Sequence, residues 1–465
     1  MFQKVLVANR GEIACRIFRT CERLGIATVA VFSDADVLSP HVAEADEAIR
    51  IGPAKVSDSY LNIPAILAAI ADVGADAVHP GYGLLSERRA FADAVNAAGV
   101  TFIGPPSEAL EAFGDKIIAR RIARGVGVSP PPGSEEPIDP KDSARLAAEA
   151  ERIGLPLLVK AAAGGGGIGM QIVRQASELE RAAQTCADRG AQAFGDGRIY
   201  LERYLDSPRH IEVQVFCDGQ GNAVALGERE CSVQRRHQKI IEESPSPAGF
   251  FSGPSGAERR AKLHQSALSV VRAVGYRGAG TVEFVANAAG ELYFLEVNAR
   301  LQVEHPVTEL VTGLDLVELQ LQVAAGQALP PNALAATPTG HAVEVRLYAE
   351  DPAKGFVPQP GTLHRFELPT DLPGVRVDSG VIAGQEITPY YDPLLAKIAA
   401  HGADRMQAIA RLSAALAQCR VELVGPKGPR TTNLAFLQQV LASPAFQSGE
   451  YDTSLAESLS RTRPS

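Results

Sequence analysis

Residues Thr281–Glu309, TVEFVANAAGELYFLEVNARLQVEHPVTE, decide how the rest of the chain is interpreted. Two apolar stretches flank a polar, glycine-bearing turn at 287–290, a pattern that predicts a β-hairpin. With a four-residue loop, Glu283 would pair with Phe294, and Glu296 would lie one diagonal step away on the same face. Two carboxylates this close on an apolar sheet are costly unless a cation lies between them, so the hairpin predicts a divalent metal site.

Polar side chains continue past the hairpin at every second position. If the chain stays extended, Asn298, Arg300, Gln302 and Glu304 share the face of Glu296. A solvent-exposed strand face with ordinary salt bridges accounts for any one of these residues, but strand interiors are normally poor in Glu and Asn. We therefore expect oxygen ligands, a guanidinium and a further carboxylate to converge on one place.

A second polar concentration follows the apolar run 155–159, where VKAAAGGGGIGM occupies 159–170. A strand that ends at Lys160 and opens into four glycines offers free backbone N–H groups and no side chains to obstruct a phosphate. The run fits neither a Walker A motif nor a dinucleotide fingerprint. A flexible surface loop would explain the glycines alone, but Lys160, Lys116 and the predicted metal carboxylates favour a flap that closes over a triphosphate.

A third concentration is basic and lies within GERECSVQRRHQKIIEE at 227–243. Because the chain carries a net charge of −9, this local cluster indicates a small anionic ligand rather than a nucleic-acid surface. The same charge argues against anionic membranes, and no apolar segment approaches the roughly 18 residues of a membrane span. The sequence therefore predicts neither nucleic acid nor membrane as a partner.

The composition is that of an ordinary globular protein. With 465 residues, 46% of them hydrophobic, the chain is expected to form two to four domains. The cysteines form no CxxC pair, which argues against a disulfide or zinc framework and indicates a reducing cytoplasm. They are Cys15, Cys21, Cys186, Cys217, Cys231 and Cys419.

Taken together, these motifs resemble the biotin carboxylases, a family of ATP-grasp ligases. The resemblance implies that ATP, Mg²⁺ or Mn²⁺, and bicarbonate yield carboxyphosphate, and that N1′ of a protein-linked biotin is then carboxylated. It covers nearly the whole chain in several independent motifs. These are VLVANRGEIA at 5–14, HPGYG at 79–83, the glycine run, RHIEVQV at 209–215, QRRHQK at 234–239, ARLQVEHPVTE at 299–309 and PYYDPLLAKI at 389–398.

The resemblance also implies a role for each motif residue. Glu304 would take the proton of bicarbonate, and Arg346, in HAVEVRLYAEDP, would stabilise the enolate-like oxygen that develops on biotin. Bicarbonate would bind to Lys239, Arg300, Gln302 and Val303, and the metal ions to Glu283, Glu296 and Asn298. The nucleotide would contact Lys116, Lys160, Gly165, Gly166, Gly167, Met170, Glu202, Leu205, His210, Gln234 and His237, with Glu202 and Leu205 at the adenine.

Some of these residues also have a plain structural interpretation. His79, and likewise His305, would close a tight turn, and Glu304 would be a buried salt-bridge partner of Arg300 or Lys239. Arg346 lies in an apolar strand pattern, where a lone arginine is usually a snorkelling surface residue.

The chain departs from the family pattern at a few positions. Ile168 stands where the glycine loop commonly has Arg or Lys, which removes one expected phosphate contact, and VNAR at 297–300 replaces the usual Asn-Thr-Arg. Ile168 and the segment TPYYDPLLAKI are similar to the urea-carboxylase branch, whereas His237 follows the acyl-CoA carboxylase pattern. The branch and the final carboxyl acceptor stay open.

Two other functions are alternatives. Another ATP-grasp ligase would phosphorylate a carboxylate that an amine then attacks, but RLQVEHP and Arg346 argue against it. A catalytically silent ATP-binding subunit is favoured slightly by Ile168 and opposed by the intact carboxylates and Lys239. No Ala-Met-Lys-Met biotin-acceptor signature occurs, so the carrier is expected on another polypeptide or a later domain. The resemblance further implies a carboxyltransferase subunit or domain as partner, and a homodimer.

The alternation of patterns predicts an α/β chain of three domains. The first should begin with a strand at 5–8, a helix at 13–24 and a strand at 28–32, and a proline-rich stretch at 128–140 should lead into a mobile lid. The expected units are a Rossmann-like domain at 1–112, an ATP-grasp domain at 113–328 with its lid at about 130–205, a β-rich carboxylase domain at 336–447 after the linker 329–340, and a tail at 448–465 ending in disordered RTRPS.

Overall fold

The computed structural model describes residues 1–162 and 169–461. Its N-terminal region is a parallel sheet with the order β3-β2-β1-β4-β5, as in Rossmann-like folds. The predicted strands at 5–8 and 28–32 and the helix at 13–24 are confirmed to within one or two residues. The elements are β1 (Lys4–Val7), α1 (Gly11–Arg23), β2 (Ala27–Ser33), α2 (Pro40–Glu44), β3 (Glu47–Gly52), α3 (Ile63–Val73), β4 (Ala77–His79), α4 (Arg89–Ala97), β5 (Thr101–Phe102) and α5 (Ser107–Gly114).

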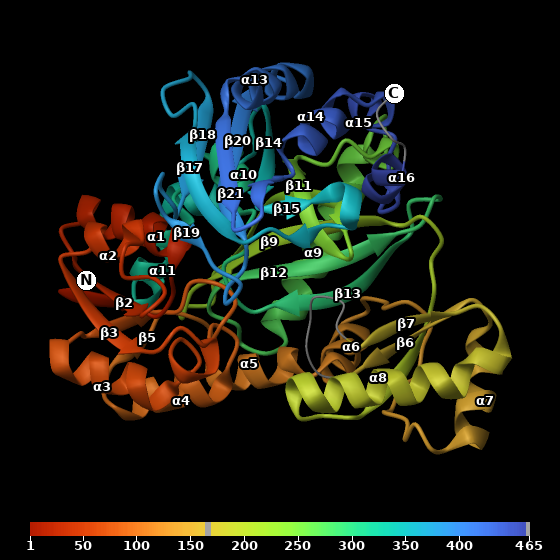
Figure 1. The fold of residues 1–465 in the computed structure, drawn as a ribbon. Coiled ribbons are helices and arrows are strands. Elements are labelled where there is room, and N and C mark those ends of the chain that lie inside the picture. Colours follow the sequence, from red (N-terminus) through yellow and green to blue (C-terminus); the bar gives the residue numbers. More distant parts are fainter. Residues whose placement is uncertain (163–168, 462–465) are drawn as a thin grey trace.

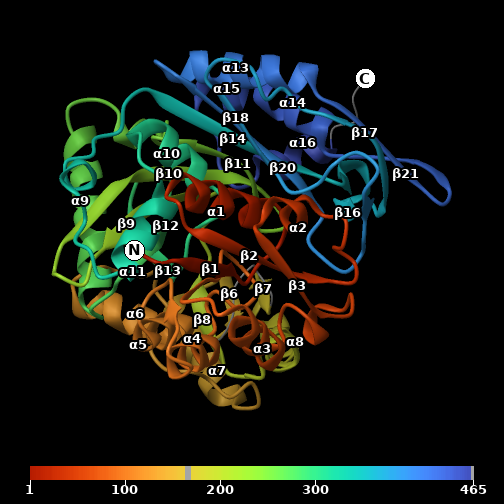
Figure 2. The ribbon, with the colours of Figure 1, turned by 90° about the vertical axis from the view of Figure 1, so that its left-hand side faces the viewer.

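Helices cover both faces of this parallel sheet, which explains why three consecutive residues of β1, Val5, Leu6 and Val7, are apolar. Val5 and Val7 pack with α1, whereas Leu6 packs with residues of α3 and α4. Figure 2 shows α1 and α2 on one side of the sheet and α3 and α4 on the other. Parallel strands are buried in this way because their crossover helices lie on the two faces.

A large antiparallel sheet forms the centre of the molecule, with the order β13-β12-β9-β10-β11-β14-β20-β18 (Figure 1). It crosses the predicted boundary between the ATP-grasp and C-terminal regions without a break, because β11 pairs with β14. Its strands are β9 (Arg209–Cys217), β10 (Ala223–Arg235), β11 (Gln238–Ser244), β12 (Gly278–Ala286), β13 (Leu292–Asn298), β14 (His341–Tyr348), β18 (Val375–Ser379) and β20 (Leu394–Gly402). The helices around it are α6 (Lys116–Gly125), α9 (Gly256–Arg272), α10 (His305–Thr312), α11 (Leu316–Ala324), α12 (Pro331–Leu334) and α13 (Arg405–Gln418).

A three-stranded antiparallel sheet with the order β7-β6-β8 lies at the lower right of Figure 1 with α7 and α8. It has an apolar core of its own, which includes Leu146, Val159 and Leu201. This sheet falls within the range predicted for the lid. The elements are α7 (Ser143–Ile153), β6 (Leu157–Ala161), β7 (Met170–Val173), α8 (Leu179–Phe194) and β8 (Ile199–Arg203). Gly165, Gly166, Gly167 and Ile168 lie outside the described residues.

The hairpin of β12 and β13 forms, but its predicted register is wrong. Ala286 pairs with Leu292 and Phe284 with Phe294, and a bulge then places Glu283 directly opposite Glu296. The extra residue lies in β13, where a bulge increases twist and re-aims the side chains that follow. The two carboxylates are therefore direct cross-strand neighbours rather than diagonal ones.

The chain does not stay extended beyond the hairpin, as the alternation to Glu304 assumed. β13 ends at Asn298, a short irregular segment follows, and α10 begins at His305 with Glu304 in the capping position. Pro306 occupies the first turn of α10, where the missing N–H is not needed by the helix. Glu304 reaches the site from a helix start and not from a strand.

The C-terminal region completes the structure with small sheets and helices. Tyr451, Leu455 and Ala456, which follow the predicted boundary at 447, are buried in one core with α13 and β14. Residues 462–465 lie outside the described residues. The elements are β15 (Glu350–Asp351), β16 (Val357–Pro358), β17 (Gly361–Glu367), β19 (Glu386–Ile387), β21 (Arg420–Gly425), β22 (Gly428–Arg430), α14 (Leu434–Ala442), α15 (Pro444–Ser448) and α16 (Leu455–Arg461).

Two sequence predictions concern the chain as a whole. All six cysteines are buried and free of disulfide bonds, as their scattered positions predicted. Within residues 1–162 and 169–461, no helix has the length and apolar character needed to cross a membrane.

Candidate active site

One cavity of about 770 Å³ collects residues from the parallel sheet, the small sheet and the large sheet. Glu304 is the exception among the described predicted residues, because it is fully buried behind the cavity wall. The predicted residues that line the cavity are Lys116, Lys160, Met170, Glu202, Leu205, His210, Gln234, His237, Lys239, Glu283, Glu296, Asn298, Arg300, Gln302, Val303 and Arg346.

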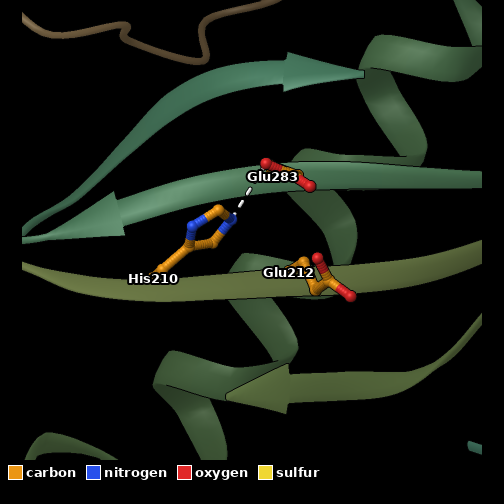
Figure 3. A group of neighbouring side chains, drawn as sticks. All are labelled: His210, Glu212 and Glu283. Carbon is orange, nitrogen blue, oxygen red and sulfur yellow. Dashed lines mark ion pairs between the residues drawn. The ribbon is translucent and has the colours of Figure 1, made fainter. Parts of the chain in front are cut away.

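Strand β9 carries polar side chains at alternate positions, and the first of them, His210, lines the cavity. His210, Glu212 and Gln214 lie on one face, while Ile211 and Val213 on the other face join the apolar core. Glu212 pairs in register with Glu283 of β12, and His210 Nε2 lies 2.9 Å from Glu283 Oε2 (Figure 3). Burial opposes the charged imidazole, but Glu283 raises the pKa of His210 above its ordinary value.

The Lys239 ammonium lies at the centre of the site among three buried carboxylates. Its Nζ is 2.8 Å from Glu283 and 2.7 Å from Glu304, and it also contacts Glu212. Burial disfavours the ammonium, but the three carboxylates together raise the pKa of Lys239 well above its ordinary value. Lys239 is therefore charged and links the hairpin carboxylate to Glu304.

The carboxylates of the hairpin are both ion-paired. Glu283 accepts hydrogen bonds from Asn298 Nδ2 at 2.8 Å and Gln302 Nε2 at 3.4 Å. Although burial favours the neutral acid, Lys239 and His210 hold the pKa of Glu283 well below its usual range. Glu296 lies 2.9 Å from Lys116 Nζ. Each of the two carboxylates is thus paired with cationic side chains of its own.

The oxygen atoms of Glu283, Glu296 and Asn298 fit a hard divalent cation such as Mg²⁺ or Mn²⁺, because all three are oxygen donors beside one cavity. A second group, His210, Glu212 and Glu283, also brings possible ligand atoms within 4.8 Å of one another. Glu212 in that group is already bound by Lys239 and by a buried arginine, so an ion-pair network accounts for it.

Glu304 and Arg346 form a buried pair behind Lys239. Arg346 Nη2 lies 2.8 Å from Glu304 Oε2 and 2.6 Å from Glu242 Oε1, and the arginine is 7% exposed. The interpretation of Arg346 as a snorkelling surface residue is therefore wrong. Burial favours protonated Glu304, but Lys239, Arg346 and Arg229 hold its pKa well below the usual range. Burial raises the pKa of Glu242 to about 7 although Arg346 opposes this.

Arg300 has partners different from those considered for it. Its Nε donates to Glu87 Oε2 at 2.9 Å, and its Nη2 donates to Asn298 Oδ1 at 3.2 Å. Glu304 was expected to form a buried salt bridge with Arg300 or Lys239, and it pairs with Lys239. Arg300 lies at the cavity wall with its guanidinium half-buried.

The residues predicted to contact the nucleotide lie between the small and large sheets. Lys160 pairs with Glu202, which also pairs with Arg120. Burial, followed by the charges of Lys116 and Arg120, lowers the pKa of Lys160 although Glu202 opposes the shift. Gln234 Nε2 contacts His210 Nδ1 at 2.8 Å, while His237 is exposed at the turn between β10 and β11. These side chains line one side of the cavity together.

The two histidines expected to close turns do so. His79 Nδ1 accepts a hydrogen bond from Gly81 N at 3.0 Å, and His305 Nδ1 donates to Gln302 O at 2.8 Å. Both imidazoles are fully buried and neither lines the cavity. Their direct contacts are structural, as predicted.

Sequence reasoning missed three buried charges at the site. Glu212 was within reach, because polar residues alternate with apolar ones in RHIEVQV, the same signal that selected the hairpin. Glu242 and Lys397 carried no such signal: their place beside Arg346 depends on the pairing of β11, β14 and β20.

Family models match the chain over most of its length. The biotin carboxylase N-terminal domain matches residues 1–110, the ATP-binding domain of the carbamoyl-phosphate synthase L chain matches 115–332, and the biotin carboxylase C-terminal domain matches 344–458. The chain belongs to the biotin carboxylase family. The resemblance read from the sequence motifs is thereby confirmed.

Relatives that match nearly the whole of this chain agree with this assignment. The biotin carboxylase of Halalkalibacterium halodurans is 48% identical, over 97% of each chain. The human mitochondrial propionyl-CoA carboxylase alpha chain is 46% identical over 97% of this chain, which spans 60% of that protein. A biotin carboxylase domain dimer of the Hydrogenobacter thermophilus 2-oxoglutarate carboxylase, solved with MgADP, ADP and bicarbonate, is 40% identical with a TM-score of 0.92 over the whole of both chains.

Proposed function

We propose that this chain catalyses the ATP-dependent carboxylation of biotin with bicarbonate, the first half-reaction of a biotin-dependent carboxylase. The observation that carries the proposal is the position of Lys239. Its ammonium contacts Glu283, on the metal and phosphate side, and also Glu304, which pairs with Arg346. A reaction that joins a phosphorylated bicarbonate to biotin needs these two halves beside each other.

Bicarbonate would bind between Lys239 and Arg300, where two cations meet an oxyanion. Gln302 and Val303 line the same part of the cavity. Glu304 is ionised because its cationic neighbours hold its pKa low, so it is in the form that accepts a proton. When bicarbonate engages Lys239, part of that stabilisation is withdrawn and Glu304 becomes the stronger base.

ATP would lie between the small and large sheets, with Lys116, Lys160 and His237 near the phosphates. A divalent ion held by Glu283, Glu296 and Asn298 would neutralise charge on the β and γ phosphates. Attack of a bicarbonate oxygen on the γ phosphorus then releases ADP and leaves carboxyphosphate.

Biotin would approach the Arg346 end of the cavity. Loss of the N1′ proton places negative charge on the ureido oxygen, and a buried guanidinium is suited to stabilise it. Arg346 already faces two carboxylates, Glu242 and Glu304, so it is held in place before substrate arrives. Residues of the parallel-sheet region, including Tyr82 and Gly83, line the same cavity.

Carrier, carboxyltransferase and dimer belong to the same proposal. The biotin would be attached to a carrier protein or domain, and a carboxyltransferase subunit or domain would use the product. Relatives of this chain include subunits of propionyl-CoA carboxylases, and a similar structure is described as a dimer. We also propose the domain boundaries 1–112, 113–328 and 336–447, with a lid at about 130–205. The matched family models support the first two, whereas the model of the C-terminal domain extends to residue 458.

Bicarbonate-dependent ADP release, measured with and without free biotin, tests the proposal. ADP release should require bicarbonate and Mg²⁺ and should rise with biotin as carboxybiotin forms. Glu304→Gln keeps the size of the side chain and should lose both products. ADP release that ignores bicarbonate but responds to an amine and a carboxylic acid would favour the other ATP-grasp ligase.

A further inference from the structure

Two buried side chains that have no part in the proposed reaction bind the backbone of Gln302–Val303, here called the bicarbonate segment. Lys397 Nζ donates to the carbonyl oxygen of Val303 at 2.9 Å, and His305 Nδ1 donates to that of Gln302 at 2.8 Å. Lys397 is 1% exposed and His305 is fully buried. Both carbonyl groups of this two-residue segment are thus held by side chains that do not line the cavity themselves.

Lys397 lies on a charged face of the large sheet. In the ladder of β14, β20 and β18 it stands opposite Arg346 on one side and Asp378 on the other. Its Nζ is also 3.1 Å from Glu12 Oε1 in α1. A buried ammonium is costly without such partners. Lys397 therefore joins the bicarbonate segment to α1 and to the strand that carries Arg346.

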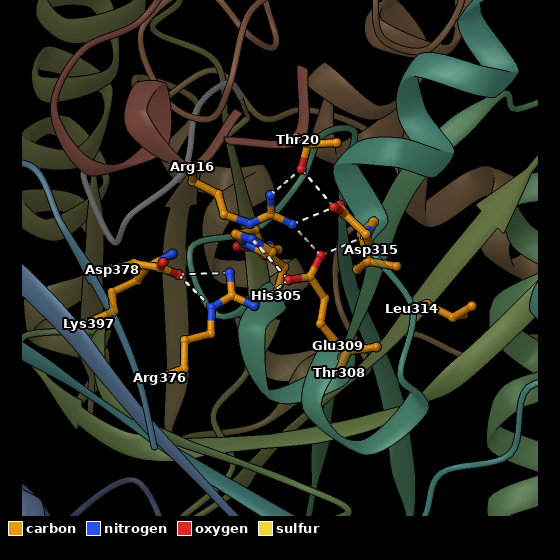
Figure 4. A network of polar contacts seen from close by, with 12 residues as sticks. Arg16, Thr20, His305, Thr308, Glu309, Leu314, Asp315, Arg376, Asp378 and Lys397 are labelled. Carbon is orange, nitrogen blue, oxygen red and sulfur yellow. Dashed lines mark hydrogen bonds and ion pairs between the residues drawn. The ribbon is translucent and has the colours of Figure 1, made fainter. Parts of the chain in front are cut away.

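His305 is fixed by a second part of the same buried network (Figure 4). Burial, together with the nearby charges of Lys397, Arg16 and Arg376, holds the pKa of His305 well below its ordinary value, so the imidazole is neutral. Its contact with a carbonyl oxygen requires the proton on Nδ1. Glu309, 3.8 Å from Nε2, is itself bound by Arg16 and Arg376.

The hydrogen bonds to these two carbonyl groups also orient the N–H groups of the residues that follow them. Each peptide unit is planar, so a fixed C=O of Gln302 sets the direction of the Val303 N–H, and a fixed C=O of Val303 sets that of the Glu304 N–H. The Gln302 side chain and the Glu304 carboxylate leave the backbone on either side of these units. A rotation of these peptide units would therefore move the proposed base, Glu304, away from Lys239.

We propose that Lys397 and His305 are positioning residues for bicarbonate: they hold the Gln302–Val303 backbone so that Gln302, Val303 and Glu304 meet the substrate. This inference rests on the proposed carboxylation activity. It assigns neither residue a contact with substrate.

The test compares Lys397→Met with Ile398→Ala, its neighbour on β20. Ile398 is buried in the core with α13, on the other face of the sheet, so its truncation destabilises the same strand without touching the bicarbonate segment. For His305, Leu removes the donor, whereas Asn keeps an amide N–H near the position of Nδ1. Each variant is assayed for bicarbonate-dependent ADP release, and hydrogen exchange is measured over residues 299–309.

A group misplaced by about 1 Å can cost roughly a hundredfold in rate, so Lys397→Met should lower kcat/KM for bicarbonate by about 10- to 100-fold. The KM for ATP should stay near that of the wild type. Exchange over 299–309 should rise in Lys397→Met and His305→Leu, and His305→Asn should recover most of the bicarbonate kcat/KM that His305→Leu loses.

The positioning role would be overturned if Lys397→Met and Ile398→Ala changed the kcat/KM for bicarbonate and the exchange over 299–309 equally. It would also be overturned if Lys397→Met impaired the KM for ATP as much as that for bicarbonate. A His305→Asn variant as impaired as His305→Leu would overturn it too. If the wild type released no ADP in response to bicarbonate, the proposed function would fail instead. The exchange measurement would still decide whether Lys397 holds the segment.

Discussion

Replacing Arg346 with methionine should separate the biotin step from the bicarbonate step. The guanidinium lies 2.6 Å from Glu242 and 2.8 Å from Glu304, and it faces the cavity. Removing a donor aimed at a developing oxyanion costs about 3–4 kcal/mol, or roughly 10²- to 10³-fold in rate. We expect carboxybiotin formation to fall by that factor. Bicarbonate-dependent ATP cleavage should continue slowly, because carboxyphosphate can form without the residue that stabilises deprotonated biotin.

The same change should destabilise the fold in a pH-dependent way. Loss of one partner from a buried ion pair costs about 3–5 kcal/mol, because Glu242 and Glu304 would stay buried without their arginine. Burial already raises the pKa of Glu242 to about 7, and without Arg346 it would rise further above the unfolded value of about 4.3. A group with a raised folded pKa loses stability as pH rises through that pKa, so the deficit should be smallest near roughly pH 5 and larger near roughly pH 8.

Following ADP and carboxybiotin separately in one reaction gives the assay. Glu304→Gln should lose both products, since it removes the proposed base for bicarbonate and carboxybiotin cannot form without carboxyphosphate. Arg405→Met is the matched control, because Arg405 forms a part-buried pair with Glu243, outside the cavity. Equal losses of ADP and carboxybiotin in Arg346→Met, with Arg405→Met retaining both, would refute the division of roles.

Three further predictions concern the hairpin and β9. Glu283→Gln and Glu296→Gln should each slow turnover at limiting Mg²⁺, and excess Mg²⁺ or Mn²⁺ should restore at least one; two unimpaired variants at limiting metal would contradict the metal assignment. The pair of His210 with Glu283 stabilises the fold fully below the ordinary histidine pKa of about 6.5 and loses that effect as pH rises through the raised pKa, and each tenfold gain in the proton affinity of the imidazole is worth about 1.4 kcal/mol. The difference in unfolding free energy between wild type and His210→Gln, from urea titrations, should therefore shrink from roughly pH 6 to roughly pH 9, and a constant difference would exclude it. Glu212→Gln should lower the unfolding free energy by about 3–5 kcal/mol, because it leaves buried Arg229 without its carboxylate; a urea midpoint equal to that of wild type would contradict this.

Side-chain alternation was the part of the site that sequence could predict. In the predicted register it places Glu283 and Glu296 on one face. The turn shifts that register by one residue, which would separate them, and the bulge in β13 brings them back to the same face. The predicted four-residue loop was wrong. The hydrogen bond from Asn287 N to Glu291 O makes the turn one residue shorter. A bulge depends on packing across the sheet, which a single strand does not encode.

The environment of Arg346 could not be predicted in the same way. Glu242, Glu304 and Lys397 reach it from β11, from the start of α10 and from β20, and their spacing in sequence carries no common period. Its burial follows from the pairing of β11 with β14, a contact between segments separated by about a hundred residues. From the strand pattern alone, a surface arginine was the reasonable expectation.

The continuity of the large sheet divides the site into two differently supported halves. Lys239, Glu283 and Arg346 stand on strands of one hydrogen-bonded ladder, so their mutual distances do not depend on how separate domains dock. Lys160 and Glu202 stand on the three-stranded sheet, which has its own core. A displacement of the small sheet would move these two residues relative to Lys116 and Glu296 while leaving Glu304 beside Arg346. Mutations can therefore affect nucleotide binding and biotin chemistry separately. Lys239 and Glu283 connect the two halves, so a change in one half would reach the other through them.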